Sequence, residues 1–220
     1  MAPPPTGGAL ANAGWRCCAV SSETLQNLLA RLIIDPDYRD EVREEAEGAF
    51  PEDLSRKERR RLIGAARDPG MDVTSTLHKA FRLNELLGQL PLTVALFDKD
   101  LLAEELGTFW QRRLPRSFYY LGEAIGFTDH LLAEEKRLAV PFLREIVSYE
   151  QAELTLQLPI EASRAKSSVR VDFRHDPREL LGTLRSGRRP VAVAELPCSL
   201  IGARGSNDEV VWPVLDPRTE

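Results

Sequence analysis

The chain has 220 residues, of which 43% are hydrophobic and 29% charged, and its formal net charge is −5. This length is enough for one large domain or for two small ones, and the acidic balance argues against nucleic-acid binding by bulk electrostatics. No apolar run approaches the length that a membrane-spanning helix needs.

The first 20 residues predict a disordered tail. They open with MAPPPTGGALANAG, which is rich in Pro, Gly and Ala and lacks the basic start and apolar core of a secretory signal. The three cysteines are too few for a full disulfide framework, and a bridge between the adjacent Cys17 and Cys18 would be strained. Cys198 is the third cysteine and stands far from the other two in sequence. This cysteine content predicts a reducing, cytoplasmic location.

Residues 21–154 predict a helical domain. Ser21 or Ser22 can cap a first helix that ends at Asp35 and Pro36, and Pro36 opens a second, short helix. Ser55 precedes Glu58 by three positions, the spacing of a capping box. The sequence DPGMD at 68–72 predicts a break, and a strong amphipathic helix follows over 73–90. Its expected buried side consists of Leu77, Phe81, Leu83, Leu86, Leu87 and Leu90.

The rest of this domain predicts further helices. LPLTVALF at 90–97 fits either a helix start or a short buried turn. The helix over 98–114 is capped by Asp98 or Asp100, and Pro115 and Pro141 start two more, over 115–138 and 141–158.

Residues 155–220 predict a small β-rich domain. SSVRVDFR alternates, with Val169, Val171 and Phe173 on one face, which is typical of a half-buried strand. Asp176 as N-cap and Gly187 as stop delimit a short helix. Further strands are expected at 190–196, with Val191 and Val193 in the sheet core, and in EVVWPVL. LTLQLPI at 154–160 is a candidate for a strand that links the two parts. The fold class is therefore α+β: an N-terminal helical bundle followed by a small C-terminal α/β domain with a short sheet.

Motifs that carry catalysis are missing. The sequence contains no Gly-x-Ser-x-Gly, no phosphate-binding glycine loop, no His-Glu-x-x-His and no Cys-x-x-Cys. His130 and Glu134 share a helix face beside Asp129, but a solvated polar stripe is a better interpretation than a metal site. His175 brought near Cys198 by the fold would make a nucleophile pair, but a free buried cysteine is the simpler reading.

Two other stretches allow an interaction role. RKERRRL at 56–62 has five basic residues in seven, which suits DNA or, more simply, a surface paired with the acidic residues around it. RSFYYLGEAIGFTDHLL at 116–132 has too many aromatic residues for one buried stripe. Some of Phe118, Tyr119 and Tyr120, with Trp110 one helix earlier, are therefore candidates for a partner interface.

The order of LLARLIIDPDYRDEV, LGTFWQRRLPRSFYYLGEAIGFTDHLL, VPFLREIVSYEQAELTL and SSVRVDFRHDPRELLGTLRSGRRPVAV resembles a known family over roughly residues 22–195. This family comprises the partner subunits of multinuclear non-haem iron-dependent oxidases, including those of methanobactin biosynthesis, which modify ribosomally made peptides. The resemblance implies a helical domain that docks on a TIM-barrel iron oxidase and a small C-terminal domain that captures the precursor's leader peptide by strand addition.

On this resemblance the chain is a non-catalytic accessory subunit, without a catalytic residue, metal or cofactor of its own, and the iron belongs to the partner enzyme. The strands that carry Val169, Val171, Phe173, Val191 and Val193 would form the peptide groove. The alternatives are a DNA-binding regulatory protein that uses residues 56–62 and a helical metalloprotein with a site at Asp129, His130 and Glu134.

Overall fold

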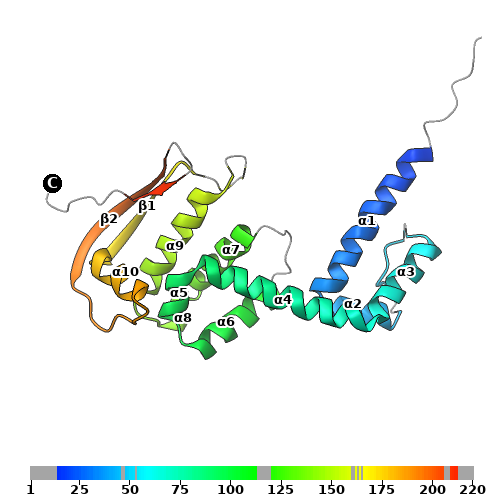
Figure 1. Cartoon of the computed structure of the whole chain (residues 1–220), viewed down its shortest axis with the longest axis horizontal. Coiled ribbons are helices and arrows are strands. Elements are labelled where there is room, and N and C mark those ends of the chain that lie inside the picture. Colours follow the sequence, from blue (N-terminus) through cyan, green and yellow to red (C-terminus); the bar gives the residue numbers. More distant parts are fainter. Residues whose placement is uncertain are drawn as a thin grey trace, which may run out of the picture. The chain divides into compact units, whose positions relative to one another are not determined.

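A computed structural model describes residues 14–45, 48–52, 54–112, 120–159, 162, 164, 166–205 and 209–212, with the main chain alone for 14–23. These residues form ten helices and one three-stranded antiparallel sheet near the C-terminus (Figure 1). The α+β class predicted from the sequence is thereby confirmed. The chain divides into two compact units, Met1–Ala80 and Phe81–Glu220.

Three helices build the core of the first unit: α1 (Gly14–Ile34), α2 (Pro36–Arg43) and α3 (Arg56–Arg67), each of which packs on the other two. The apolar residues at their common centre are Leu32, Tyr38, Val42, Ala49, Leu54, Leu62 and Ala66. Because α1 begins at Gly14, the prediction of a disordered tail is wrong for residues 14–20. Residues 1–13 lie outside the described part.

Side-chain caps define where these helices begin. Asp35 accepts a hydrogen bond from the Tyr38 N–H at 3.0 Å, and Pro36 occupies the first helical position of α2. The predicted capping box of α3 is confirmed: the Ser55 hydroxyl accepts from the Glu58 N–H at 3.3 Å, and Glu58 accepts from the Ser55 N–H at 2.9 Å.

Helix α4 (Pro69–Gln89) contradicts the sequence prediction at two places. The expected break at 68–72 is reduced to Asp68, whose carboxylate accepts from the Gly70 N–H at 2.7 Å, so the turn residues start a helix instead. Leu77 and Phe81 were expected to be buried, but they are 65% and 51% exposed. Leu77 precedes the buried Leu86 by nine positions, which places it on the opposite side of the helix, about 180° away.

The second unit is organised around one buried helix. Its helices between α4 and the first strand are α5 (Pro91–Leu96), α6 (Lys99–Arg112), α7 (Tyr120–Ala133), α8 (Glu135–Leu138) and α9 (Leu143–Gln157). Helix α9 packs on α5, on α7 and on the sheet, and residues on all of its sides are buried. It runs through residue 154, where the change of pattern had predicted a domain boundary; the strand expected at 154–160 is also wrong, because Leu154–Gln157 is helical.

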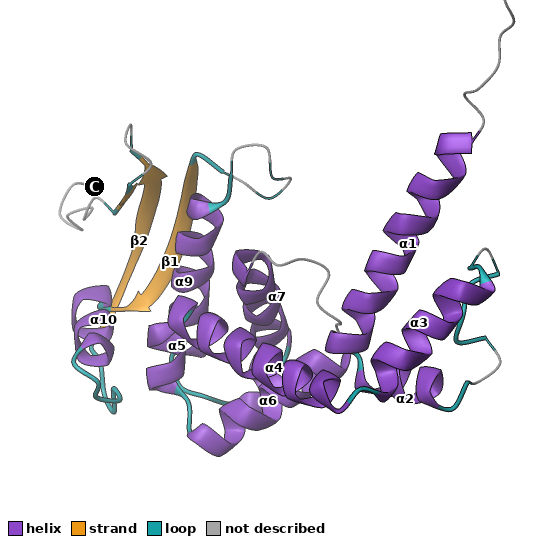
Figure 2. Cartoon of the chain, turned by 45° about the vertical axis from the view of Figure 1, so that its right-hand side comes forward, coloured by secondary structure: helices purple, strands orange, loops and turns teal. Residues whose placement is uncertain are grey.

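The sheet has the order β1–β2–β3, with strands β1 (Ser168–His175), β2 (Glu195–Arg204) and β3 (Val210–Val211). Val171 lies opposite Leu200 and Phe173 opposite Cys198. Figure 2 shows the sheet beside α9, and the buried side chains of Val171, Phe173 and Leu200 belong to the core shared with that helix. Helix α10 (Pro177–Arg185) connects β1 to β2, with Asp176 as its N-cap as predicted.

Candidate peptide-binding site

Strand β1 is an edge strand. It pairs with β2 on one side, and no strand among the described residues pairs with its other side. Among the described residues, strand β3 pairs only with the end of β2, at Ala203 and Arg204. An edge of this kind presents main-chain donors and acceptors to which an extended peptide can add as a further strand.

The register shows which residues of β1 point outward. The Arg204 N–H donates to the Ser167 carbonyl at 2.9 Å, so residues 167 and 204 form a hydrogen-bonded pair. Such pairs occur at every second residue of an antiparallel ladder. The main-chain groups of Val169, Val171 and Phe173 therefore point toward β2. The main-chain groups of Ser168 and Asp172 therefore point away from β2. The N–H of Arg174 points the same way and donates to the Glu145 carboxylate at 2.7 Å.

A pocket of about 490 Å³ adjoins the end of this edge. We call it the β1 pocket. Strand β1 provides Asp172, Phe173, Arg174 and His175, and Pro197 comes from β2. The opposite wall comes from α8, α9 and the turn between them: Glu135, Val140, Phe142, Leu143, Arg144 and Glu145. The pocket thus joins a wall that includes the apolar Val140, Phe142 and Leu143 to a strand edge. This is the combination in which main-chain bonds hold a peptide and a pocket receives one of its side chains.

Glu145 holds the two walls of the β1 pocket together. Its carboxylate is buried in the first turn of α9 and accepts hydrogen bonds from the N–H groups of Arg174 and His175, at 2.7 and 2.9 Å. Its Oε2 atom lies 2.9 Å from Nδ1 of the His175 ring. The same ring packs edge-on against Phe142, with ring centroids 4.8 Å apart. These contacts fix β1 against the start of α9.

The outward face of the sheet carries a small polar network. Asp172 accepts hydrogen bonds from Ser199 at 2.6 Å and from Arg170 at 2.8 Å. The Ser199 hydroxyl and then the Arg170 guanidinium lower the pKa of the Asp172 carboxyl, so this side chain carries its negative charge beside the free edge.

The structure separates the five residues predicted to form the sheet core and the peptide groove. Val171 and Phe173 are buried on β1, and Val169 is partly buried against the same core. The strand predicted at 190–196 is wrong, because β2 begins only at Glu195. Val191 is 95% exposed and Val193 is partly buried, and neither lies on a strand. The loop that follows α10 is longer than the alternation in PVAVAELP indicated.

The four candidate interface residues cannot be treated as one surface. Phe118 and Tyr119 lie outside the described residues. Trp110 is partly buried, donates its indole N–H to Glu123 at 2.7 Å and lies 5.0 Å from the Arg82 guanidinium. Tyr120 is partly buried at the start of α7, with its ring 5.4 Å from that of Phe81. Trp110 therefore has a structural role within the second unit.

Asp129, His130 and Glu134 each have different partners. Asp129 pairs with Arg164 at 2.9 Å, and His130 Nε2 lies 3.0 Å from the buried Glu105. Glu134 pairs with Arg137, which lowers the pKa of its carboxyl. Among the described residues there is no group of three or more His, Cys, Asp or Glu side chains placed to hold a metal ion.

Cys198 is a free cysteine on β2, and burial raises the pKa of its thiol, which disfavours the reactive thiolate. The side chains of Cys17 and Cys18 are outside the described part. Sequence reasoning did not identify Glu145, because a glutamate in a helical first turn looks like an ordinary exposed residue. The one signal in the sequence for a role of Glu145 was its place near the start of a helix, three residues after Phe142.

Comparison with models of known protein families gives no match for this chain, and comparison with curated proteins gives none either. Among the described residues, no helix combines the length and apolar character that crossing a membrane requires.

Proposed function

We propose that this chain is a non-catalytic partner protein that binds the leader of a ribosomally made precursor peptide and presents it to an iron-dependent peptide-modifying oxidase of the TIM-barrel type. The observation that carries the proposal is the outward side of β1, with which no strand among the described residues pairs, next to the β1 pocket. The resemblance in segment order supports the oxidase as the partner, and the proposed location is the cytoplasm.

In this proposal the leader adds to β1 as a new edge strand. Its main chain pairs with Ser168 and Asp172, and one apolar side chain enters the β1 pocket against Val140, Phe142 and Leu143. Recognition divides between sequence-independent main-chain bonds and one side-chain pocket, which suits a subunit that must hold an extended segment while another protein acts on the rest of the peptide.

The partner is tested by a tagged pull-down from the native cell, with proteins and small peptides identified by mass spectrometry. Recovery of an iron oxidase together with a short precursor is the expected result. Recovery of the oxidase without any peptide would contradict leader capture, and recovery of neither would contradict the whole proposal.

The binding mode is tested on the recovered precursor with two variants at one position. Asp172→Pro removes an outward N–H and leaves the ladder with β2 in place, since proline is tolerated where an edge N–H faces away from the sheet. Asp172→Ala removes the same side chain but keeps the N–H. We expect the proline variant to lose at least about tenfold in affinity relative to the alanine variant, ~1.4 kcal/mol. Equal affinities, with both circular dichroism spectra unchanged, would argue against strand addition at β1.

A further inference from the structure

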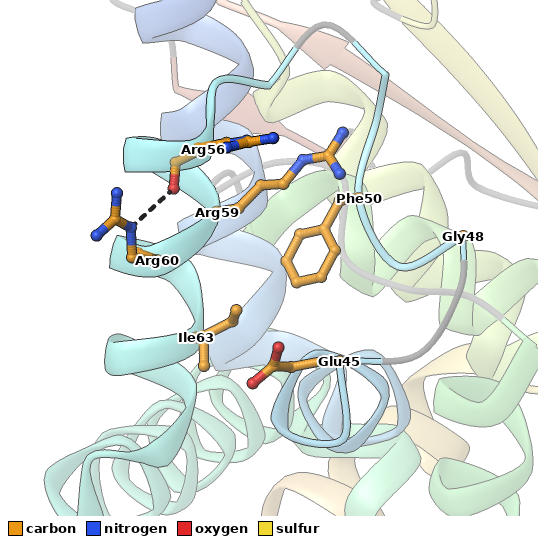
Figure 3. Close-up of a pocket in the computed structure, with 7 residues that line it drawn as sticks. All are labelled: Glu45, Gly48, Phe50, Arg56, Arg59, Arg60 and Ile63. Carbon is orange, nitrogen blue, oxygen red and sulfur yellow. Dashed lines mark hydrogen bonds between the residues drawn. The ribbon is translucent and has the colours of Figure 1, made fainter.

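A second pocket, of about 560 Å³, lies wholly within the first unit. We call it the α3 pocket. Its lining is Glu45, Gly48, Phe50, Arg56, Arg59, Arg60 and Ile63 (Figure 3). The three arginines and Ile63 are spaced i, i+3, i+4 and i+7 along α3, so they share one helix face, while Leu62 and Ala66 face the core. The basic run that looked like an ordinary solvated surface therefore directs part of its charge into a hollow.

The positive charge of the α3 pocket is not balanced by described neighbours. Within the described part of the chain, no carboxylate forms an ion pair with Arg56, Arg59 or Arg60. Glu45, the acidic residue of the lining, pairs with Arg67 at 2.8 Å, so its charge is already compensated. An unbalanced cluster of guanidinium groups favours an anion, which each of them can bind through two parallel hydrogen bonds.

Arg59 is held in place by contacts that do not use all of its N–H groups. It donates to the Pro51 carbonyl at 3.3 Å, and its guanidinium lies 5.8 Å from the centre of the Phe50 ring. Its Nε atom is buried and has no hydrogen-bond partner among the described residues. A buried donor without a partner costs free energy.

The floor of the pocket is apolar. Phe50 and Ile63 are partly buried and pack against the core of the first unit. Figure 3 shows the Phe50 ring below the side chains of Arg56 and Arg59, with Ile63 farther along the helix and the Arg60 guanidinium directed away from the ring. A ligand in this space meets guanidinium groups at one end and a ring face below them.

We propose that the α3 pocket binds a small organic anion, a phosphate or carboxylate group joined to a flat apolar body. Arg56 and Arg59 hold the anionic group, and the body lies on Phe50 and Ile63. The volume is that of a small-molecule site, since ligand pockets are roughly 300–1,000 Å³. A nucleic-acid backbone would use the charge but not the apolar floor, so a discrete small anion fits the lining better. This site is independent of peptide binding at β1.

The test uses the full chain and three probes: phenyl phosphate, inorganic phosphate and phenol. Binding is followed by isothermal titration and by amide chemical-shift changes. We expect phenyl phosphate to bind at least about tenfold more tightly than either fragment, a difference of ~1.4 kcal/mol, because it alone uses both parts of the pocket. Shift changes are expected within residues 45–63. Equal affinity for phenyl phosphate and inorganic phosphate would overturn the proposal.

Three variants separate the pocket from the general charge of α3. Arg59→Gln and Phe50→Leu alter the lining, whereas Arg61→Gln removes one exposed charge from the same helix outside the pocket. We expect Arg59→Gln to weaken phenyl phosphate binding about tenfold, and Phe50→Leu to reduce the preference over inorganic phosphate. An equal loss in Arg61→Gln would overturn the proposal, as would binding of a duplex oligonucleotide with no response to phenyl phosphate.

Discussion

Glu145 at the start of α9 contacts His175 at the end of β1 through both of its carboxylate oxygens. Oε1 accepts the His175 main-chain N–H at 2.9 Å, and Oε2 lies 2.9 Å from the ring Nδ1. One carboxylate therefore fixes both the backbone and the ring of the residue where the strand ends. This junction shapes the β1 pocket, so the stability of the fold and the shape of the candidate site depend on the same side chain.

Replacing Glu145 by alanine is expected to destabilise the protein by about 2–4 kcal/mol, because the partly buried N–H groups of Arg174 and His175 lose their acceptor. Glu145→Gln should cost less, since the amide oxygen still accepts from the main chain. Urea denaturation measures both. Glu135→Ala serves as the control, since Glu135 pairs with Arg144 at a largely exposed site and its loss should cost about 1 kcal/mol or less. Equal costs for Glu145→Ala and Glu135→Ala would contradict the role assigned to Glu145.

Glu150 is expected to make stability depend on pH near neutrality. Its buried carboxylate accepts from the N–H groups of Leu92 and Thr93, at 2.6 and 2.8 Å, and from the Thr93 hydroxyl. Burial outweighs these hydrogen bonds and raises the pKa of Glu150 to about 7, from 4.5 in an unfolded chain. Because the folded state binds the proton more tightly, the stabilisation is complete below pH 4.5 and is lost as the pH rises through about 7.

The measurement is the free energy of unfolding between pH 5 and pH 8, which should fall by at most about 3 kcal/mol. Glu150→Gln cannot ionise and should flatten the curve over this range. The groups with lowered pKa values, Asp172 and Glu134, affect stability only at lower pH, since their contribution is lost as they are protonated. A curve for Glu150→Gln as steep as that of the unaltered protein would exclude Glu150 as the source.

Local rules predicted much of the fold because the signals involved are local. The capping box at Ser55 and Glu58 and the N-cap at Asp176 depend on a few neighbouring residues, and the structure confirms both. The alternation of Val169, Val171 and Phe173 likewise located β1. The predictions at Leu77 and Val191 were wrong because burial and strand pairing depend on partners distant in sequence. Val191 follows an apolar alternation, but β2 starts four residues later.

The candidate site was only partly predictable. A short edge strand in the C-terminal part was expected from the sequence. The pocket beside it was not, because it forms where the α8–α9 turn meets β1, some 30 residues away along the chain: Glu145 contacts His175 across a separation of 30 positions. The α3 pocket was missed for a different reason. A basic run gives no sign of which of its residues face an apolar ring such as that of Phe50.

Gly202 is expected to tolerate no side chain. A Cβ atom at this position would lie 2.8 Å from the Trp212 ring and 2.9 Å from Leu156 of α9, closer than packed atoms approach. Gly202→Ala should therefore destabilise the protein by about 1–3 kcal/mol.

Gly182 in α10 is the matched control, because a Cβ there meets nothing within 4 Å. Gly182→Ala should stabilise by about 0.5–1 kcal/mol through helix propensity. Thermal denaturation checks whether the two substitutions change stability in opposite directions. A Gly202→Ala variant of unchanged stability would contradict the close packing of Trp212.

The buried pair between Arg82 and Glu123 ties α4 to α7 within the second unit. The guanidinium donates two hydrogen bonds to the carboxylate, at 2.5 and 3.1 Å, and Glu123 also accepts the indole N–H of Trp110 at 2.7 Å. Glu123→Ala leaves Arg82 as a buried charge without its carboxylate and should cost about 3–5 kcal/mol. The double change Arg82→Met with Glu123→Leu removes both charges and should recover most of that loss. The free energies of unfolding of the two variants check this. A double variant as unstable as Glu123→Ala would mean that packing around the pair, and not the isolated charge, causes the loss.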